Sequence, residues 1–193
     1  MKIGIIGKGN VGTALGTAFA AKGHQIRYGH RDPRETVPDA AKWGEVVILA
    51  VPFSAVRDSV QSIGSAADGK ILIDVTNAIG ENGGLAIGHT TSAAEELQKQ
   101  LPKARVVKAF NTVFAKNQRT GNVRGVQLTA FIAGDDTAAK QAVANLAKDI
   151  GFDPVDVGKL SGARYLEPMA MMLINLGYGL GMGTDIGYRL VRP

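Results

Sequence analysis

Three glycines near the start of the chain have the spacing with which a backbone holds phosphate. Residues 7–12 read Gly-Lys-Gly-Asn-Val-Gly, which matches G-x-G-x-x-G, and they follow a short apolar run. In that setting Gly7 allows a tight turn, Gly9 leaves room for a pyrophosphate, and Gly12 lets a helix pack closely on a strand. The start of the helix directs free N–H groups and a partial positive charge at the phosphates. We therefore expect dinucleotide binding by Gly7, Lys8, Gly9, Asn10, Val11 and Gly12; the alternative is a tight turn without a ligand.

The end of the second predicted strand indicates which dinucleotide. Enzymes that use NAD usually have an acid there, which binds the ribose 2′-hydroxyl. This sequence instead has Gly29-His30-Arg31, followed by Arg34. An arginine offers several donors to a 2′-phosphate, whereas an acid repels it. The pattern predicts NADP as the cofactor, bound by His30, Arg31 and Arg34; an exposed basic loop is the alternative.

A third group of residues follows the later predicted strands. It contains Val51-Pro52-Phe53, Asn77 and the segment 108–112, Lys-Ala-Phe-Asn-Thr. Open α/β sheets bind ligands at the carboxyl ends of their strands. Each residue also has an ordinary structural role, such as ending a strand or satisfying turn backbone. Taken together, Val51, Pro52, Phe53 and Asn77 are predicted to surround the nicotinamide.

Alternating strand-like and helix-like segments must position these motifs. Apolar runs predict strands at 3–6, 25–28, 46–51, 70–75, 105–107, 127–133 and 154–157, with a glycine-rich loop at 78–90. Helical spacing connects them, and a last helix is expected over 169–176. This order predicts an α/β fold of the Rossmann type, a doubly wound, mainly parallel sheet. We expect an NADP-binding domain over 1–157 and a small helical, glycine-rich C-terminal cap over 158–193.

Composition argues against several other functions. The 193 residues include no cysteine, and the three histidines are dispersed, so no metal site and no cysteine chemistry are predicted. The net charge is +5, but the basic residues are scattered, so we expect no nucleic-acid partner. The longest uncharged run, 168–184, is too short to span a bilayer and carries four glycines. With no signal peptide at the start, the expectation is a cytoplasmic protein without a membrane partner.

No group of side chains predicts acid–base catalysis. The sequence lacks a G-x-S-x-G element, and residues 161–167 contain no Tyr-x-x-x-Lys pair. Hydride transfer between two heterocycles needs mainly positioning, because the cofactors carry the chemistry. We therefore predict no catalytic side chain.

At this point the chain resembles the coenzyme F420-dependent NADP oxidoreductases over nearly its whole length. The resemblance lies in residues 7–12, 29–31, 131–136 and 155–161, in Arg164 and Glu167, and in the C-terminal segments 173–175 and 181–187. It implies hydride transfer between nicotinamide C4 and deazaflavin C5 without an obligatory acid or base. It also implies that Lys8, Gly9, Asn10, Val11, His30 and Arg31 bind NADP, with Ala109 near the nicotinamide. Segments 74–77 and 107–112 are more similar to the reductase domain of the STEAP metalloreductases, which use flavin.

Three functions remain open at this stage. The first is an NADP(H)-dependent oxidoreductase with F420 or a flavin as hydride acceptor. The second is a non-catalytic NADP(H)-binding sensor, and the third is a reductase of a small imine or carbonyl compound. A tricyclic ring needs an open apolar slot, whereas a small acid needs a closed pocket with a cation, for which Lys108 is the candidate. The charge-free C-terminal helix favours a homodimer.

Overall fold

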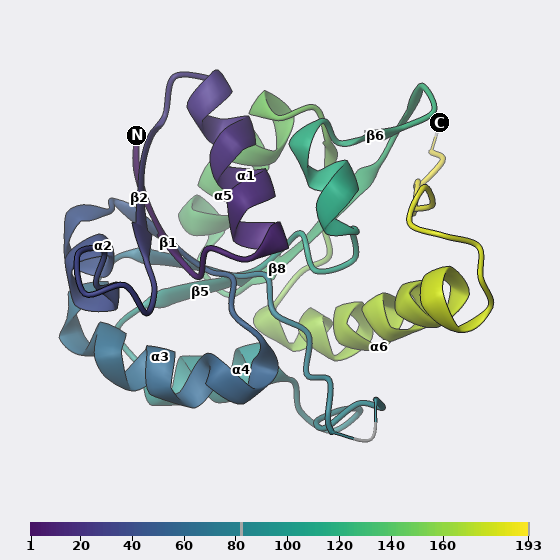
Figure 1. Ribbon diagram of the computed structural model, residues 1–193. Helices are drawn as coiled ribbons and strands as arrows, with labels where there is room; N and C mark the ends of the chain where they lie inside the picture. Colours follow the sequence, from purple (N-terminus) through teal and green to yellow (C-terminus); the bar gives the residue numbers. More distant parts are fainter. Residues whose placement is uncertain (82, 193) are drawn as a thin grey trace.

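A seven-stranded sheet forms the centre of the molecule (Figure 1). The structure, a computed structural model, describes residues 1–81 and 83–192. Asn82, in the predicted 78–90 loop, and Pro193, in the predicted cap, lie outside the described residues. The strand order is β2-β1-β3-β4-β5-β8-β9. The strands are β1 (Lys2–Ile6), β2 (Gln25–Gly29), β3 (Val46–Leu49), β4 (Ile71–Asp74), β5 (Arg105–Lys108), β8 (Thr129–Gly134) and β9 (Asp153–Asp156).

The strand directions follow the predicted Rossmann arrangement over most of the sheet. Strands β1 to β5 are parallel to one another, and every residue of β3 and β4 is buried. Continuous apolar strands of this kind are typical of a parallel sheet that is covered on both faces. Strand β8 pairs antiparallel with β5, and β9 runs parallel to β8. The mainly parallel, doubly wound α/β sheet is therefore confirmed, and its last two strands are reversed.

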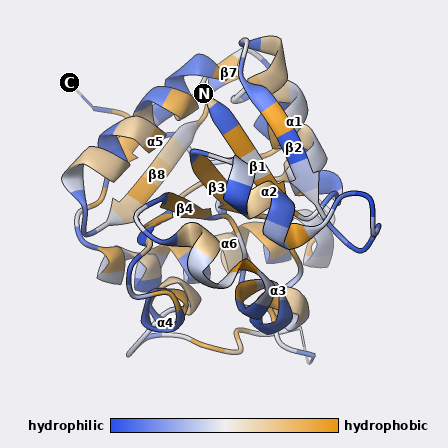
Figure 2. Cartoon of the chain, turned by 90° about the vertical axis from the view of Figure 1, so that its left-hand side faces the viewer, coloured by the Kyte–Doolittle hydropathy of each residue, from blue (hydrophilic) through white to orange (hydrophobic). Residues whose placement is uncertain are grey.

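Helices cover both faces of the sheet and create two separate hydrophobic cores. On one face lie α1 (Asn10–Ala21) and α5 (Thr137–Asp149); on the other lie α2 (Val37–Trp43), α3 (Val56–Ile63), α4 (Ala93–Gln100) and α6 (Ala163–Ile174) (Figure 1). Figure 2 shows hydrophobic residues concentrated on the central strands and hydrophilic residues on the outer sides of α3 and α4. The side chains of Ser92 and Asp136 cap α4 and α5 by accepting the backbone N–H groups of Glu95 and Ala139.

The C-terminal helix is longer than the sequence pattern predicted. The pattern indicated a start at Met169, but α6 begins at Ala163 and contains Pro168 in its interior. The charged residues Arg164 and Glu167 interrupt the apolar spacing, so the first turn was missed. The helix continues into a π-helical turn, Asn175–Gly179. The 3-10 helix η1 (Phe53–Ala55) leads directly into α3. Further elements that were not predicted are the 3-10 helices η2 (Gly64–Ala67), η3 (Ala115–Arg119) and η4 (Leu160–Gly162), and the hairpin of β6 (Asn122–Val123) and β7 (Val126–Gln127).

The reversal of β8 carries this strand past the end of its neighbour. Ala133 pairs with Lys108, the last residue of β5, so residues 129–132 extend beyond the carboxyl edge of the parallel strands (Figure 1). The chain after α6 is attached to this overhang. The backbone N–H of Thr129 donates to the Tyr188 carbonyl at 2.9 Å, and its hydroxyl accepts from the Leu190 N–H at 2.9 Å. The C-terminal segment is thus held by the sheet.

None of the helices in the described part of the chain combines the length and the apolar character that crossing a membrane requires.

Candidate functional site

The strand register brings the carboxyl ends of five strands into one row. Gly29, Ile6, Leu49, Asp74 and Lys108, the last residues of these strands, are paired in this order from β2 to β5. The chain crosses from one side of β1 to the other between β2 and β3. A crevice opens at such a reversal of strand order, and it is the usual ligand site of an open α/β sheet. The glycine motif of residues 7–12 lies at this crevice.

The three glycines of that motif have different surroundings. Gly7 has a φ of 104°, and a Cβ there would lie 2.2 Å from the Ala50 carbonyl oxygen. A Cβ on Gly12 would lie 2.1 Å from the Gly7 carbonyl oxygen. Around Gly9, in contrast, no atom lies within 4 Å of the added Cβ. Two glycines are therefore required by the packing of the turn, and the third leaves open space where a pyrophosphate can approach the first turn of α1.

Two cavities meet at Gly9 and form one trough. The first, here the basic cavity, measures about 520 Å³ and includes Lys8, His30 and Arg31 in its lining. The second, the amide cavity, measures about 470 Å³ and includes Asn10 and Asn77. Val11, Phe53 and Thr76 also line the amide cavity, and both cavities share Gly9, Ala50, Val51 and Pro52. The trough therefore joins a cationic end near β2 to a mainly apolar end near β4, as the shape of a dinucleotide requires.

Arg31 and Arg34 differ in their availability to a ligand. Arg31 lines the basic cavity and makes no ion pair within residues 1–81 and 83–192. Arg34 instead donates two hydrogen bonds to the Asp32 carboxylate, at 3.0 and 2.7 Å, and its side chain is 87% exposed. These bonds hold the pKa of Asp32 at about 2. Arg34 is not part of the cavity lining, so Arg31 is the better candidate for a phosphate contact.

An acid that the sequence reasoning missed lies beside the basic cavity. Glu35 accepts a hydrogen bond from Lys8 Nζ at 2.7 Å and a second, short one from His30 Nε2. The bond from Lys8, followed by that from His30, lowers the pKa of Glu35. The backbone N–H of His30 also donates to the Glu35 carbonyl at 2.8 Å, which closes the 30–35 loop. The Asp32-Pro33 pair in the sequence favours a turn, and a turn there would have predicted that Glu35 lies near His30.

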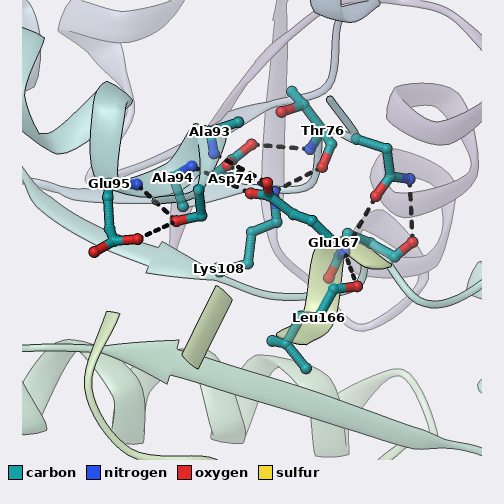
Figure 3. A network of polar contacts seen from close by, with 11 residues as sticks. Asp74, Thr76, Ala93, Ala94, Glu95, Lys108, Leu166 and Glu167 are labelled. Carbon is teal, nitrogen blue, oxygen red and sulfur yellow. Dashed lines mark hydrogen bonds and ion pairs between the residues drawn. The ribbon is translucent and has the colours of Figure 1, made fainter. Parts of the chain in front are cut away.

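At the other end of the strand row, Lys108 is completely buried between two acids (Figure 3). Its Nζ lies 2.9 Å from Asp74 Oδ2 and 3.0 Å from Glu167 Oε1, and it donates to the Thr76 carbonyl at 2.7 Å. Burial opposes the charged form, but Asp74 and Glu167 outweigh it, so the pKa of Lys108 is raised. Because all three ammonium donors are used inside the protein, Lys108 is not the substrate cation that a small-acid pocket would need.

The same buried cluster connects α4, α6 and the amide cavity. The Glu167 carboxylate accepts the backbone N–H groups of Ala93 and Ala94, at 3.0 and 3.2 Å, in the first turn of α4. Asn111 donates to the Leu166 carbonyl at 2.9 Å and to Asn77 Oδ1 at 3.1 Å. Figure 3 shows Glu167 with Lys108, Ala93 and Ala94 in this network, and Leu166 beside it. The position of Asn77 in the trough therefore depends on the position of α6.

Besides Arg34, two of the expected site residues lie away from the cavity surface. Ala109 is completely buried and belongs to the core on the α1 and α5 face, so the structure does not bring its side chain to the trough. It follows Lys108 at the end of β5, where the packing of the α1 and α5 face covers it. Gly12 is also buried, and its role is the contact with Gly7 described above. The remaining glycine-motif residues, with His30, Arg31, Val51, Pro52, Phe53 and Asn77, line the trough.

Comparisons with known proteins agree with this geometry. The sequence profile of the family described as NADP oxidoreductase coenzyme F420-dependent matches residues 2–38 and 34–78. The F420-dependent NADP reductase of Methanothermobacter thermautotrophicus is 31% identical over 207 residues, which cover 91% of this chain and 89% of that protein. The chain belongs to the F420-dependent NADP oxidoreductase family.

Two further relatives show how far the similarity extends. Metalloreductase STEAP3 of Rattus norvegicus is 32% identical over 185 residues, and the matched region covers 90% of this chain but 37% of that protein. A crystal structure from Arthrobacter sp. FB24, described as a candidate F420-dependent NADP-reductase, has a TM-score of 0.93 at 29% identity and covers both chains completely. The F420-dependent NADP oxidoreductase family therefore shares the fold along the whole length of the chain.

Proposed function

We propose that this protein binds NADPH in the trough and transfers hydride between its nicotinamide and a deazaflavin, F420, or a flavin. The observation that carries the proposal is the continuity of the trough from Arg31, past the open space at Gly9, to Asn77. Arg31 and His30 would bind the 2′-phosphate. The N–H groups at the start of α1 would bind the pyrophosphate, and the amide cavity would hold the nicotinamide. When both groups are bound, the nicotinamide and the acceptor ring supply the hydride chemistry.

The amide cavity supports a reaction that depends on positioning. Among the described residues that line it, Glu81 is the one ionisable side chain, and it is exposed. Lys108, the cation expected of a pocket for a small acid, is buried and paired. Apolar side chains such as Val51, Phe53 and Val75 make up much of the remaining lining and suit the face of a flat ring. These features favour hydride transfer between heterocycles over reduction of a small imine or carbonyl compound.

The test is stopped-flow measurement of hydride transfer from 4-deuterated NADPH to F420, FMN and FAD in turn. We expect reduction of at least one of these acceptors, slowed by the deuterium, and for F420 retention of the label at C5. The N5–H of a reduced flavin exchanges with water, so flavin reduction is followed by absorbance and by the isotope effect on its rate. NADPH binding without reduction of any acceptor would support the sensor function instead. The variant Glu81→Gln distinguishes the proposed reaction from reduction of a small imine or carbonyl compound. Such a reduction would need a general acid, whose loss costs about 10²–10⁴ in rate. We expect the Glu81→Gln rate constant to stay within about threefold of the wild type, since no side-chain proton is needed.

A further inference from the structure

A third cavity lies beside the trough and is not used by the proposed dinucleotide. This α1 groove measures about 490 Å³ and lies between α1 and residues 114–119, with Tyr178 and Thr184 from the C-terminal segment. It shares Lys8 and Gly9 with the basic cavity, and Gly9 and Asn10 with the amide cavity. A ligand that lies over the amide cavity can therefore enter the α1 groove by passing Asn10.

The charges of the groove suit an anion. Lys8, Lys116 and Arg119 line it, and none of its described lining residues is Asp or Glu. Lys8 and Lys116 each pair with one acid outside the lining, Glu35 and Asp185, both at 2.7 Å. Arg119 makes no ion pair and no side-chain hydrogen bond within the described chain, so its guanidinium is available to a ligand. Positively charged walls around a concave surface attract anionic ligands.

Hydroxyl and aromatic groups complete the groove. Thr13 and Thr17 lie one turn apart on the exposed side of α1 and add two hydroxyls. On the opposite wall, Phe114 and Tyr178 pack edge to face with ring centroids 5.4 Å apart. A Cβ on Gly177 would lie 2.6 Å from Phe114 Cζ, so this glycine lets the π-helical turn approach Phe114 closely. Tyr178 consequently stands at the groove with 69% of its surface exposed.

We propose that the α1 groove binds the anionic tail of the hydride acceptor, a chain that carries phosphate or carboxylate groups. This inference rests on the proposed function, because it places the acceptor ring over the amide cavity. The Gly9 turn and Arg31 already account for the pyrophosphate and the 2′-phosphate of NADPH. The groove has its own cations, and Arg119 has no partner in the described chain. A phosphate-bearing tail that passes Asn10 would meet Arg119 and Lys116 while its ring remains against the nicotinamide.

Inorganic pyrophosphate is the probe that tests this proposal. In the hydride-transfer assay it should compete with the acceptor, F420 or FMN, when NADPH is saturating. By calorimetry it should bind the NADP⁺-saturated protein, and Arg119→Gln should weaken this binding roughly three- to fivefold, as expected for one solvent-exposed charge contact. The matched control is Arg124→Gln, which makes the same charge change on the neighbouring β6–β7 turn, outside the groove lining. Neither variant should change the affinity for NADPH.

Three outcomes would overturn the groove assignment and leave the proposed function intact. Pyrophosphate that fails to bind the NADP⁺-saturated protein would remove the anion site. Equal weakening by Arg119→Gln and Arg124→Gln would show that general charge, and not the groove, attracts pyrophosphate. Inhibition that competes with NADPH instead of the acceptor would place the anion in the trough. Absence of hydride transfer before any pyrophosphate is added removes the proposed function, and the assignment of an acceptor tail with it.

Discussion

Each end of the strand row carries a cluster of three charged or ionisable side chains, one cluster buried and the other partly exposed. At the β5 end, one cation, Lys108, is shared by two acids and has no contact with solvent. At the β2 end, one acid, Glu35, is shared by two side chains, Lys8 and His30, that remain partly exposed. A buried charge must be fully paired, whereas an exposed group can exchange its partner for a ligand. Burial therefore distinguishes the charges that stabilise the fold from those that can bind a cofactor.

Removal of Lys108 should show the largest difference in stability between the two ends. Lys108→Met would leave Asp74 and Glu167 buried without their partner, so we expect it to lower the free energy of unfolding by about 3–5 kcal/mol. Lys8→Met at the exposed end should cost no more than about 1 kcal/mol. Urea denaturation of both variants measures the difference. Similar losses in the two variants would contradict the comparison.

A side chain at Gly9 should block the β2 end without harming the fold. Gly9 has extended backbone angles, and an added Cβ meets no atom within 4 Å, so Gly9→Val should fold with nearly unchanged stability. It should nevertheless abolish NADPH binding, because the valine fills the space of the pyrophosphate. Gly12→Ala is the matched control, since its Cβ would lie 2.1 Å from a backbone oxygen and should destabilise the protein. Normal NADPH affinity of folded Gly9→Val, measured by calorimetry, would place the phosphates elsewhere.

The two arginines near β2 should contribute unequally to cofactor choice. Arg31→Ala removes the unpaired guanidinium of the basic cavity and should weaken NADPH binding about tenfold, with little change for NADH. Arg34→Ala should change either affinity by less than about twofold, because Arg34 is bound to Asp32 outside the cavity lining. Titration of both nucleotides by fluorescence measures these ratios. Equal weakening of NADPH and NADH in Arg31→Ala would remove the 2′-phosphate contact.

The smallest effect is expected at Glu35. At neutral pH this acid is ionised, because its folded pKa lies below the ordinary value of 4.5. Glu35→Gln removes a negative charge beside the expected 2′-phosphate and releases Lys8 and His30, so NADPH should bind about two- to fivefold more tightly. NADH has no 2′-phosphate and serves as the control ligand. Weaker NADPH binding at pH 7.5 would show that Glu35 mainly holds the two basic side chains in place.

Sequence patterns predicted the parts of the fold that depend on local rules. Strand-like segments indicated every strand of the central sheet, including β2 and β9, which are not continuously buried. The direction of β8 was missed because the alternation of apolar residues is the same in both directions. A signal existed in residues 109–128, since they contain no helix long enough for a parallel crossover. The local pattern therefore identified strands more reliably than their connections.

The sequence predicted those parts of the site that lie within one short, continuous motif. The glycine turn and Arg31 lie in short segments with a known geometry, and both line the trough. The ion pairs of Lys108 join β4, β5 and α6, so they depend on strand register and on a helix whose start was not recognised. Glu35 required the closure of the 30–35 loop. Ala109 was placed in the site by resemblance, and its burial reflects packing that no local pattern specifies.

The overhang of β8 also affects how the molecule can move. Residues 129–132 continue the sheet beyond the carboxyl edge and hold the C-terminal segment through Thr129. Enzymes that close over their ligands usually do so at a hinge between domains, on a microsecond to millisecond timescale. Here the β8 overhang and the segment after α6 are joined by the hydrogen bonds of Thr129 with Tyr188 and Leu190, so a closure that moves this segment would have to break these bonds. Ligand exchange is therefore expected to proceed by side-chain rotation, with turnover insensitive to solvent viscosity.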